Sequence, residues 1–305
     1  MGMVPVRMKT FDLNPGHLPF DLDKTLDCGQ VFRWEKEGDE WRGIVNGSLV
    51  SVRQKEACLI YDGITEDDLI AYFNLNLDLA GVITSIRDTI SSGNPCGRDT
   101  LFENVFQAGN GLRIIRQDPW ECLISFICSQ NSNIPAIKKR ISLLCSSFGR
   151  AGSVGYHHFP SPEIIAQADL SAICSCKTGY RASYISETAR RIRDEPDFLS
   201  PVRITGEHGR EQLMSLPGVG PKVADCVLLF AYNYYQVVPV DVWIRSIITR
   251  YYPRDDPEGS TNRKRTYEDI SSFCQNYFGS YAGYAQQLLF AARSELTDTG
   301  KEPGP

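Results

Sequence analysis

Three residues with reactive side chains lie close together in the sequence around a glycine-rich turn. In LPGVGPKVADC (216–226), Lys222 falls in the first turn of an expected helix, and Cys226 lies one turn later on the same face. Asp241 follows in VPVDVW. The positive end of a helix disfavours an ammonium ion, and a neutral amine is a nucleophile. We therefore consider Lys222 a candidate nucleophile and Asp241 its proton acceptor.

Each of these residues also has an ordinary explanation. A lysine is usually a solvated surface residue, and a cysteine often packs as a small buried apolar group. Asp241 precedes an apolar-periodic stretch, so it also fits the N-cap of a helix. The capping role and a catalytic role are compatible with each other.

The turn itself is suited to holding a phosphate. The stretch about 207–232 is interpreted as a helix-hairpin-helix motif, with Gly218 and Gly220 between the two helices. Glycines allow a sharp turn that exposes consecutive backbone N–H groups at the positive end of the second helix. Such donors can hold a DNA phosphate without any basic side chain. The alternative is a turn that only connects two helices.

The elements that must position these residues change in character near residue 98. Before it, GIVNGSLVSVRQ (43–54) predicts a hairpin with a type I′ turn at Asn46-Gly47. QVFRW (30–34) and ACLIY (57–61) are interpreted as strands, and two helical stretches follow. SSGNPCGRD (91–99) is the best candidate linker.

After the linker, nearly every periodic stretch is helical. Helix start signals occur at Asp99, Asp118-Pro119, Ser161-Pro162 and Asp241. The chain of 305 residues is long enough for two domains. We expect an α+β fold: a small N-terminal antiparallel β-sheet domain with helices (1–98), followed by a larger all-helical domain (99–305) with the helix-hairpin-helix motif.

Composition limits the class of protein. No run of about 18 apolar residues exists, so no membrane contact is expected. The ten cysteines are scattered through apolar stretches, which indicates reduced thiols in an intracellular protein, and their spacing predicts no zinc or iron–sulfur cluster. Residues 1–98 hold 10 Lys and Arg against 15 Asp and Glu, and residues 99–305 hold 22 of each. Binding of DNA would thus require a local site rather than a basic surface.

Several stretches together carry a resemblance to a known family. LPGVGPKVADC followed by VPVDV resembles the helix-hairpin-helix DNA glycosylases with a Gly/Pro-rich loop and a catalytic aspartate. Within that superfamily the chain resembles the 8-oxoguanine DNA glycosylases. The other matching stretches occur in the family's order along nearly the whole chain: CGQVFRW (28–34), RQDPWECLISFICSQNSNI (116–134), YHHFPS (156–161), GYRASY (179–184) and YAGYAQQLLF (281–290).

The resemblance implies a reaction. Lys222 would attack the sugar C1′ and expel the damaged base, and the covalent imine would permit β-elimination of the 3′ phosphate, with Asp241 as catalytic partner. The base must first leave the duplex, because its glycosidic bond is unreachable in the stack. The implied partner is double-stranded DNA containing 8-oxoguanine.

The resemblance also implies a base pocket. The Gly29 carbonyl would accept a hydrogen bond from the N7–H that only the oxidised purine carries, since normal guanine has an acceptor at N7. Gln286 would contact the Watson–Crick edge, and Phe290 and Cys226 would stack on the two faces of the base. The ordinary alternatives are an exposed helix residue for Gln286 and core packing for Phe290.

Further residues match positions that contact DNA or an ion in the family. Asn131 resembles the residue that fills the gap left by the flipped base. Tyr180 resembles the wedge at the kinked step, and Arg181 a contact to the orphaned partner base. Three backbone carbonyls match a monovalent-cation site at the hairpin: those of Met214, Leu216 and Val219. No other cofactor is implied.

Three positions depart from the animal members of the family. Ser132 replaces an asparagine, Ala136 replaces an arginine that reads the opposite cytosine, and Trp243 replaces a histidine that contacts phosphate. A bidentate base contact is worth about 1–3 kcal/mol of discrimination. We therefore predict a weaker preference for cytosine opposite the lesion, and the phosphate contact at Trp243 is in doubt.

Two other functions remain open from the sequence. One is a glycosylase of the same superfamily for another damaged purine, such as an alkylated one. The other is a non-enzymatic DNA-binding module, which would keep the glycines and would not need Lys222 or Asp241. In every case we expect a monomer located with the DNA, in the cytoplasm of a prokaryote or the nucleus of a eukaryote.

Overall fold

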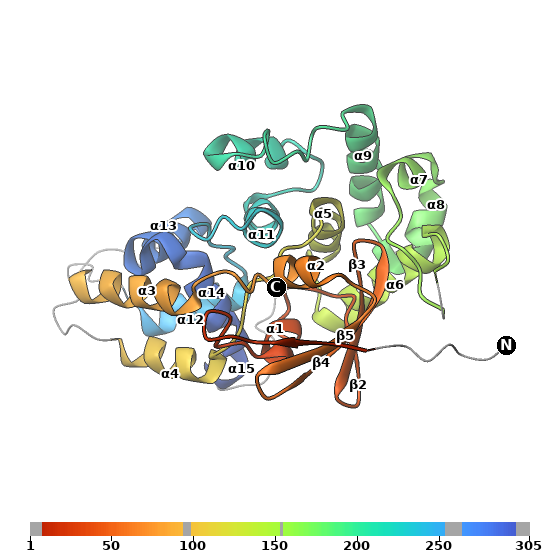
Figure 1. Cartoon of the computed structure of the whole chain (residues 1–305). Coiled ribbons are helices and arrows are strands. Elements are labelled where there is room, and N and C mark those ends of the chain that lie inside the picture. The colour runs from red at the N-terminus through yellow and green to blue at the C-terminus, as the bar shows by residue number, and fades with distance from the viewer. Residues whose placement is uncertain (1–7, 94–98, 153–154, 254–263, 297–305) are drawn as a thin grey trace.

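A computed structural model describes residues 8–93, 99–152, 155–253 and 264–296 of the chain (Figure 1). Its first part holds a five-stranded antiparallel sheet in the order β1-β5-β4-β3-β2. The strands are β1 (Lys9–Asp12), β2 (Glu35–Glu37), β3 (Glu40–Val45), β4 (Ser48–Lys55) and β5 (Cys58–Asp62). Neighbours in this sheet are mostly neighbours in the chain, so short turns suffice to connect them.

The hairpin between β3 and β4 confirms the predicted type I′ turn. Val45 pairs with Ser48, and the two residues between them have positive φ angles, 48° at Asn46 and 74° at Gly47. A type I′ turn requires positive φ at both central positions, which Asn and Gly tolerate best. The strand predicted at ACLIY is also present, as β5.

The strand predicted at QVFRW (30–34) is wrong. This stretch follows α1 (Leu22–Leu26) as an irregular, nearly fully buried segment. Side chains rather than a strand partner pair its backbone: the Gln117 amide donates to the Gln30 carbonyl at 2.7 Å. Val31, Phe32 and Trp34 are all buried, whereas a strand with one solvated face would bury alternate residues.

The other regular elements of the described chain are helices, and they confirm the predicted α+β class. Three precede residue 94: α1, α2 (Glu66–Tyr72) and α3 (Leu79–Gly93). The others are α4 (Thr100–Gly109), α5 (Pro119–Cys128), α6 (Ile134–Phe148), α7 (Pro162–Gln167), α8 (Leu170–Ile173), a π-helical turn η1 (Cys174–Thr178), α9 (Arg181–Asp194), α10 (Gly206–Met214), α11 (Pro221–Tyr232), α12 (Val242–Tyr251), α13 (Tyr267–Phe278), a 3₁₀ turn η2 (Gly279–Tyr281), α14 (Ala282–Ala291) and α15 (Arg293–Leu296).

The predicted helix starts agree with the structure. The side chains of Asp99, Asp118 and Asp241 accept hydrogen bonds from backbone amides in the first turns of α4, α5 and α12. Ser161 precedes α7, although its hydroxyl makes no capping hydrogen bond there. The caps satisfy amide groups that a helix start leaves without partners.

The buried hydrophobic residues of the described chain form two cores. One fills the sheet and α1–α2, whereas α3 packs in the helical core through Val82, Ile83, Ile86 and Ile90. In Figure 1, α3 and α4 lie beside α13 and α14 from the other end of the chain. The predicted linker lies partly outside the described residues, so the boundary at 98 stays a prediction. No helix in the described ranges is long and apolar enough to cross a bilayer.

Candidate functional site

The hairpin between α10 and α11 confirms the predicted helix-hairpin-helix motif. Gly218 has φ +74°, and a Cβ there would lie 2.3 Å from the Tyr184 ring. Gly220 is the N-cap of α11, which begins with Pro221. The amides of Gly218 and Gly220 have no acceptor among the described residues. They are therefore available for an anionic ligand such as a phosphate.

Lys222 lies just inside α11, with its amine directed toward the end of α5. Its Nζ donates to Ser129 Oγ at 3.0 Å and lies 4.8 Å from the centroid of the Phe126 ring. The Ser129 hydroxyl donates in turn to the Phe126 carbonyl at 2.8 Å. Lys222 is partly buried rather than a freely solvated surface lysine. The amine is thereby held in a defined position.

The side chain of Asp241 shares this region and caps α12. It accepts a hydrogen bond from the Ile244 amide at 2.8 Å. Burial raises the pKa of Asp241, against the opposing effects of the Ile244 amide and the Lys222 charge. No ion pair joins Lys222 to Asp241 within the ranges the structure describes. The two groups thus interact electrostatically, and direct transfer of a proton would require them to approach.

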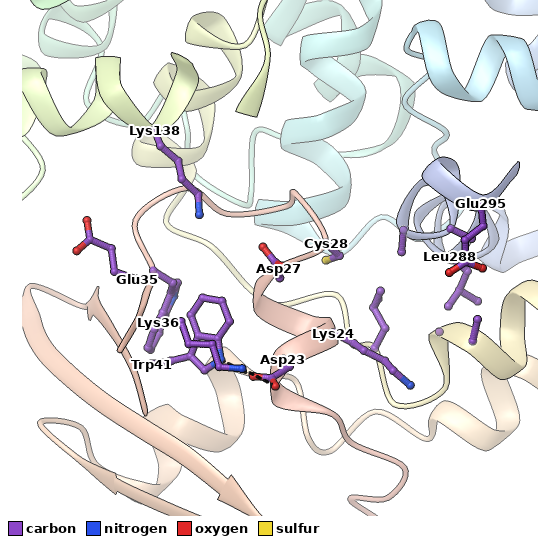
Figure 2. Close-up of a pocket in the computed structure, with 16 residues that line it drawn as sticks. Asp23, Lys24, Asp27, Cys28, Glu35, Lys36, Trp41, Lys138, Leu288 and Glu295 are labelled. Carbon is purple, nitrogen blue, oxygen red and sulfur yellow. Dashed lines mark hydrogen bonds and ion pairs between the residues drawn. The ribbon is translucent and has the colours of Figure 1, made fainter. Parts of the chain in front are cut away.

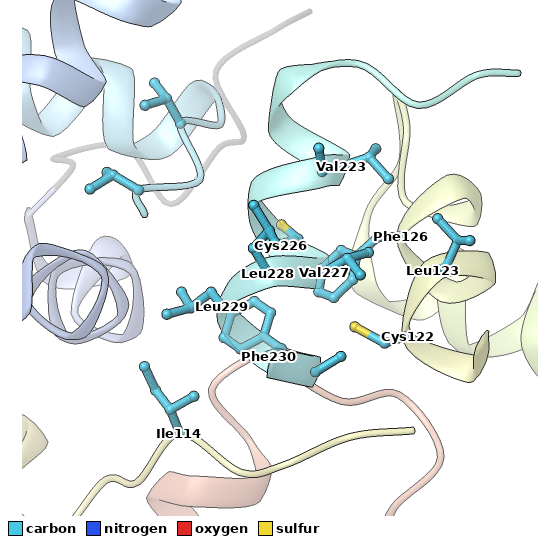
Figure 3. Close-up of a cluster of buried hydrophobic side chains, with 14 of the residues drawn as sticks. Ile114, Cys122, Leu123, Phe126, Val223, Cys226, Val227, Leu228, Leu229 and Phe230 are labelled. Carbon is cyan, nitrogen blue, oxygen red and sulfur yellow. The ribbon is translucent and has the colours of Figure 1, made fainter. Parts of the chain in front are cut away.

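The residues beneath these groups form a continuous apolar packing. Cys226 is 2% exposed, and burial raises its pKa to about 12, so it stays a thiol at neutral pH. Figure 3 shows Cys226 on α11 with Phe126 of α5 nearby. The Phe126 and Phe230 rings stack with centroids 5.5 Å apart. This packing fixes α5 and α11 relative to each other, and hence Ser129 relative to Lys222.

Two elements of the predicted base pocket, Gly29 and α14, lie next to each other. Gly29 has φ +80°, and a Cβ there would lie 3.0 Å from the Phe290 ring and 3.3 Å from Ile134. The Arg293 guanidinium covers the Phe290 ring, 4.2 Å from its centroid. Only a glycine leaves the space between this backbone and the aromatic ring.

Gln286 is the clearest sign of a ligand. It is 4% exposed, which makes the exposed-helix alternative wrong, and its Oε1 accepts no hydrogen bond from the described residues. A buried acceptor without a partner costs about 1–3 kcal/mol. An amide oxygen retained at that cost is consistent with a polar molecule that enters the pocket and donates to it.

The predicted DNA-contacting residues come together from two loops. The Asn131 Nδ2 donates to the Tyr180 hydroxyl at 3.1 Å, and Tyr180 is 50% exposed. Arg181 is buried, and its guanidinium donates to the carbonyls of Gln130 and Asn131. Its predicted contact with the partner base stays a prediction, because these donors are engaged with the protein.

The carbonyls expected to hold a monovalent cation lie in the hairpin. The Leu216 carbonyl accepts from the Val219 amide at 3.1 Å, which leaves its second lone pair for another partner. The cation at Met214, Leu216 and Val219 stays a prediction. Within residues 8–93, 99–152, 155–253 and 264–296, no group of three His, Cys, Asp or Glu side chains could hold a metal ion.

Sequence reasoning missed three residues of the site. Ser129 accepts a hydrogen bond from the Lys222 amine. Gln130 donates to the Gly218 carbonyl, and Arg140 donates to the Ser132 hydroxyl. Ser129 and Gln130 lie in the ICSQNSN stretch, so their position within a family motif was the available signal. Ala136 lies one turn before Arg140 on α6, and Trp243 lies in the first turn of α12, where its amide faces Asp241.

A separate cleft borders the Gly29 segment and α14, since Cys28, Leu288 and Ala291 are among the residues that line it. It has a volume of about 700 Å³, and Asp27, Lys36, Lys138 and Glu295 are among its lining residues (Figure 2). None of the predicted catalytic or base-pocket residues lines it. This cleft is therefore not the site that the sequence predicts around Lys222 and Gly29.

Comparisons with known proteins show the family to which the chain is similar. Residues 12–123 match the model for the N-terminal domain of 8-oxoguanine DNA glycosylase, and residues 124–275 match the model for HhH-GPD superfamily base excision DNA repair proteins. The N-glycosylase/DNA lyase OGG1 of Arabidopsis thaliana is 30% identical, over 93% of this chain and 80% of the relative. The N-glycosylase/DNA lyase of Saccharomyces cerevisiae is 33% identical, over 88% and 82%.

Solved structures are similar over almost the whole chain. MBOgg1 in complex with a low-affinity DNA ligand superposes with a TM-score of 0.79 and 32% identity, covering 98% of this chain and all of that one. The Clostridium acetobutylicum 8-oxoguanine glycosylase/lyase, bound to duplex DNA with cytosine opposite 8-oxoguanine, has a TM-score of 0.79 and 31% identity. That match covers 90% of this chain and 92% of that one.

Proposed function

The chain belongs to the 8-oxoguanine DNA glycosylase family of the helix-hairpin-helix superfamily, and from this premise we propose that it excises 8-oxoguanine through a lysine imine and then cleaves the strand by β-elimination. It is a bifunctional DNA N-glycosylase and lyase of base excision repair. The observation that carries the proposed mechanism is the Lys222 amine, held by Ser129 beside the buried carboxyl of Asp241.

The proposed reaction begins at the flipped nucleotide. The neutral Lys222 amine forms a bond to C1′, and the glycosidic bond breaks with its electron pair leaving on the base, which takes up a proton. The attached nitrogen gives up one proton, and the C1′–O4′ bond opens with its electron pair going to O4′, which takes up a proton, so that a protonated imine forms. Loss of a C2′ proton then breaks the C3′–O bond. Asp241 would stabilise the positive charge that develops at C1′ and on the nitrogen.

The proposed lesion follows from the donors and acceptors of the pocket. 8-Oxoguanine carries N–H donors at N7 and on its Watson–Crick edge, and the pocket holds an unpartnered buried acceptor on Gln286. The Phe290 ring lies beside the Gly29 backbone and offers an apolar face for stacking. A base with N–H groups on two edges would satisfy both sides of this pocket.

The base opposite the lesion is proposed to matter less than in animal members of the family. Ala136 lies on the first turn of α6 and carries no donor side chain that could reach a cytosine edge. Excision rates opposite the four normal bases, measured under single-turnover conditions, test this. Comparable rates are expected, and a strong preference for cytosine would contradict the proposal.

The remaining features of the proposal concern the assembly. We propose that the protein acts as a monomer on double-stranded DNA, with no cofactor beyond a monovalent cation at the hairpin. Light scattering of the free protein and of its DNA complex would measure the mass directly. Replacing potassium or sodium by a bulky organic cation at constant ionic strength should weaken DNA binding if the hairpin carbonyls hold an ion.

Borohydride trapping tests the proposed function as a whole. The substrate is a duplex with one 8-oxoguanine opposite cytosine, and the proteins are the wild type, Lys222→Gln and Lys139→Gln, an exposed lysine on α6. Trapping by the wild type and Lys139→Gln only would establish the imine and its nucleophile. Base release without trapping would mean that water attacks. If the wild type shows neither trapping nor base release, the results would favour another damaged purine as substrate, or a DNA-binding module without activity.

A further inference from the structure

Two loops meet where Asn131 contacts Tyr180, and both turn through the left-handed region of φ. Asn131 has φ +43°, which asparagine tolerates, and Lys177 has φ +61°, which lysine seldom adopts. The Lys177 conformation costs roughly 1–3 kcal/mol and persists only when the surroundings hold it. Something in this part of the fold must therefore hold the Lys177 turn.

Arg140 does so from α6. Its Nε donates to the Lys177 carbonyl at 2.9 Å, in the turn that leads to Tyr180. Its Nη1 donates to the Ser132 hydroxyl and to the Cys128 carbonyl at 3.3 Å, on either side of Asn131. One guanidinium thus contacts both loops, whose residues are far apart in the sequence.

Arg181 makes a second connection between the two loops. It starts α9, directly after Tyr180, and donates to the carbonyls of Gln130 and Asn131. Arg181, at the start of α9, therefore holds the Asn131 loop. Arg140, on α6, holds the Tyr180 loop. Each loop is tied to the helix that begins after the other one.

The two guanidinium groups stay near each other despite their charge. Burial and the neighbouring Arg181 charge both lower the pKa of Arg140, although an arginine remains protonated in a protein. Like charges placed together repel, so this placement is maintained by the carbonyl acceptors between them. A solvated surface arginine would move away instead.

We propose that Arg140 is a positioning residue that assembles the Asn131 and Tyr180 side chains into one rigid unit before DNA binds. The inference rests on the proposed function and on the roles that the family resemblance implies for these side chains, which would enter the duplex where the damaged base leaves. A preformed unit loses less conformational entropy on binding than two mobile loops would. Arg140 would therefore act on the opening of the duplex and leave the chemistry at Lys222 unchanged.

The first test compares a paired lesion with an unpaired one. Arg140→Met is measured beside Arg190→Met, an exposed arginine on α9 that makes no hydrogen bond or ion pair in the described structure. Single-turnover excision of 8-oxoguanine opposite cytosine should fall about 10- to 100-fold in Arg140→Met only, as expected for lost charge-assisted hydrogen bonds. Excision of 8-oxoguanine placed opposite an abasic site should change little, because a base without a pairing partner is extruded more easily than a paired one.

Equal losses on the two substrates, or no loss on the paired one, would overturn the proposal. Arg140→Lys should recover only part of the activity, because an ammonium group cannot reach three acceptors as a planar guanidinium does. Trapping on a preformed abasic site should match the wild type, which shows that Lys222 still works.

A second measurement needs no DNA. Hydrogen exchange of the free protein should accelerate in residues 129–132 and 176–181 together in Arg140→Met, and stay at wild-type rates in Arg190→Met. Unchanged exchange rates in both segments would refute the proposed positioning role of Arg140. If the wild type excises neither substrate, the proposed function fails, and this measurement still decides the role of Arg140.

Discussion

Gly29→Ala isolates the role of the base pocket. The residue has φ +80°, and a left-handed conformation costs a residue other than glycine about 1–2 kcal/mol. The new Cβ would also lie 3.0 Å from Phe290 Cε1 and 3.3 Å from Ile134 Cδ1. Carbon atoms prefer separations of about 3.5–4.0 Å, so either the ring or the Gly29 backbone must move by a few tenths of an ångström or more.

Gly38→Ala is the matched control. Gly38 lies between β2 and β3 with φ +65°, and nothing lies within 4 Å of a Cβ built there. Both variants should lose about 1–2 kcal/mol of unfolding free energy from the backbone conformation. Only Gly29→Ala should lose excision, by about 100-fold, because a small misplacement of reacting groups has effects of that size.

The assay separates base recognition from strand cleavage. Release of 8-oxoguanine is followed under single-turnover conditions, and cleavage of a preformed abasic site is followed separately. Gly29→Ala should keep the second activity, since an abasic site has no base to place in the pocket. Wild-type excision by Gly29→Ala, or an equal loss of both activities, would refute the assignment of Gly29 to the pocket.

Four further predictions follow from the same geometry. Burial raises the pKa of Asp241, so excision should decline with falling pH above the usual aspartate range near about 3.9, and a decline only below it would contradict this. A raised pKa in the folded state contributes stability at low pH, and this stability is lost as the pH rises through that pKa. Asn is also a good N-cap and carries no charge. Asp241→Asn should therefore be inactive and yet harder to unfold by denaturant at neutral pH. Gly218→Ala should weaken DNA binding in a titration far more than Gly206→Ala. A Cβ at Gly218 would lie 2.3 Å from the Tyr184 ring, whereas a Cβ at Gly206 would have no atom within 4 Å. Equal affinities of the two variants would contradict a role of the hairpin in DNA binding. Ser129→Ala should slow imine trapping without reducing DNA affinity, and an unchanged trapping rate would remove its role in holding the lysine amine.

Local features of the fold could be predicted from the sequence. The turn at Asn46-Gly47 and the caps at Asp99, Asp118 and Asp241 depend on residues within a few positions of one another. The strand at QVFRW failed because its apolar residues are buried for a tertiary reason: Gln30 and Gln117 fix that segment against the rest of the protein. Hydrophobic composition by itself does not separate a buried strand from a buried irregular segment.

The candidate site divides in the same way. Lys222, Asp241 and the hairpin glycines lie within 24 positions of the sequence (218–241), and their spacing was enough to suggest an amine, a carboxylate and a phosphate-binding turn. The absence of an ion pair between Lys222 and Asp241, and the choice of Ser129 as the partner of the amine, depend on how α5 packs against α11. Sequence spacing does not contain that packing.

By itself, then, the sequence determined the reactive groups, their family and the helices and turns that carry them, because these follow from residue types at short range. Only the tertiary structure decided which distant groups meet. Gly29 lies against Phe290 from the other end of the chain, and the Gln286 oxygen is buried without a hydrogen-bond partner among the residues that the structure describes. Arg140 ties together two loops that no local pattern connects. Such contacts arise from the packing of complete elements, which is fixed by the whole core rather than by any one stretch.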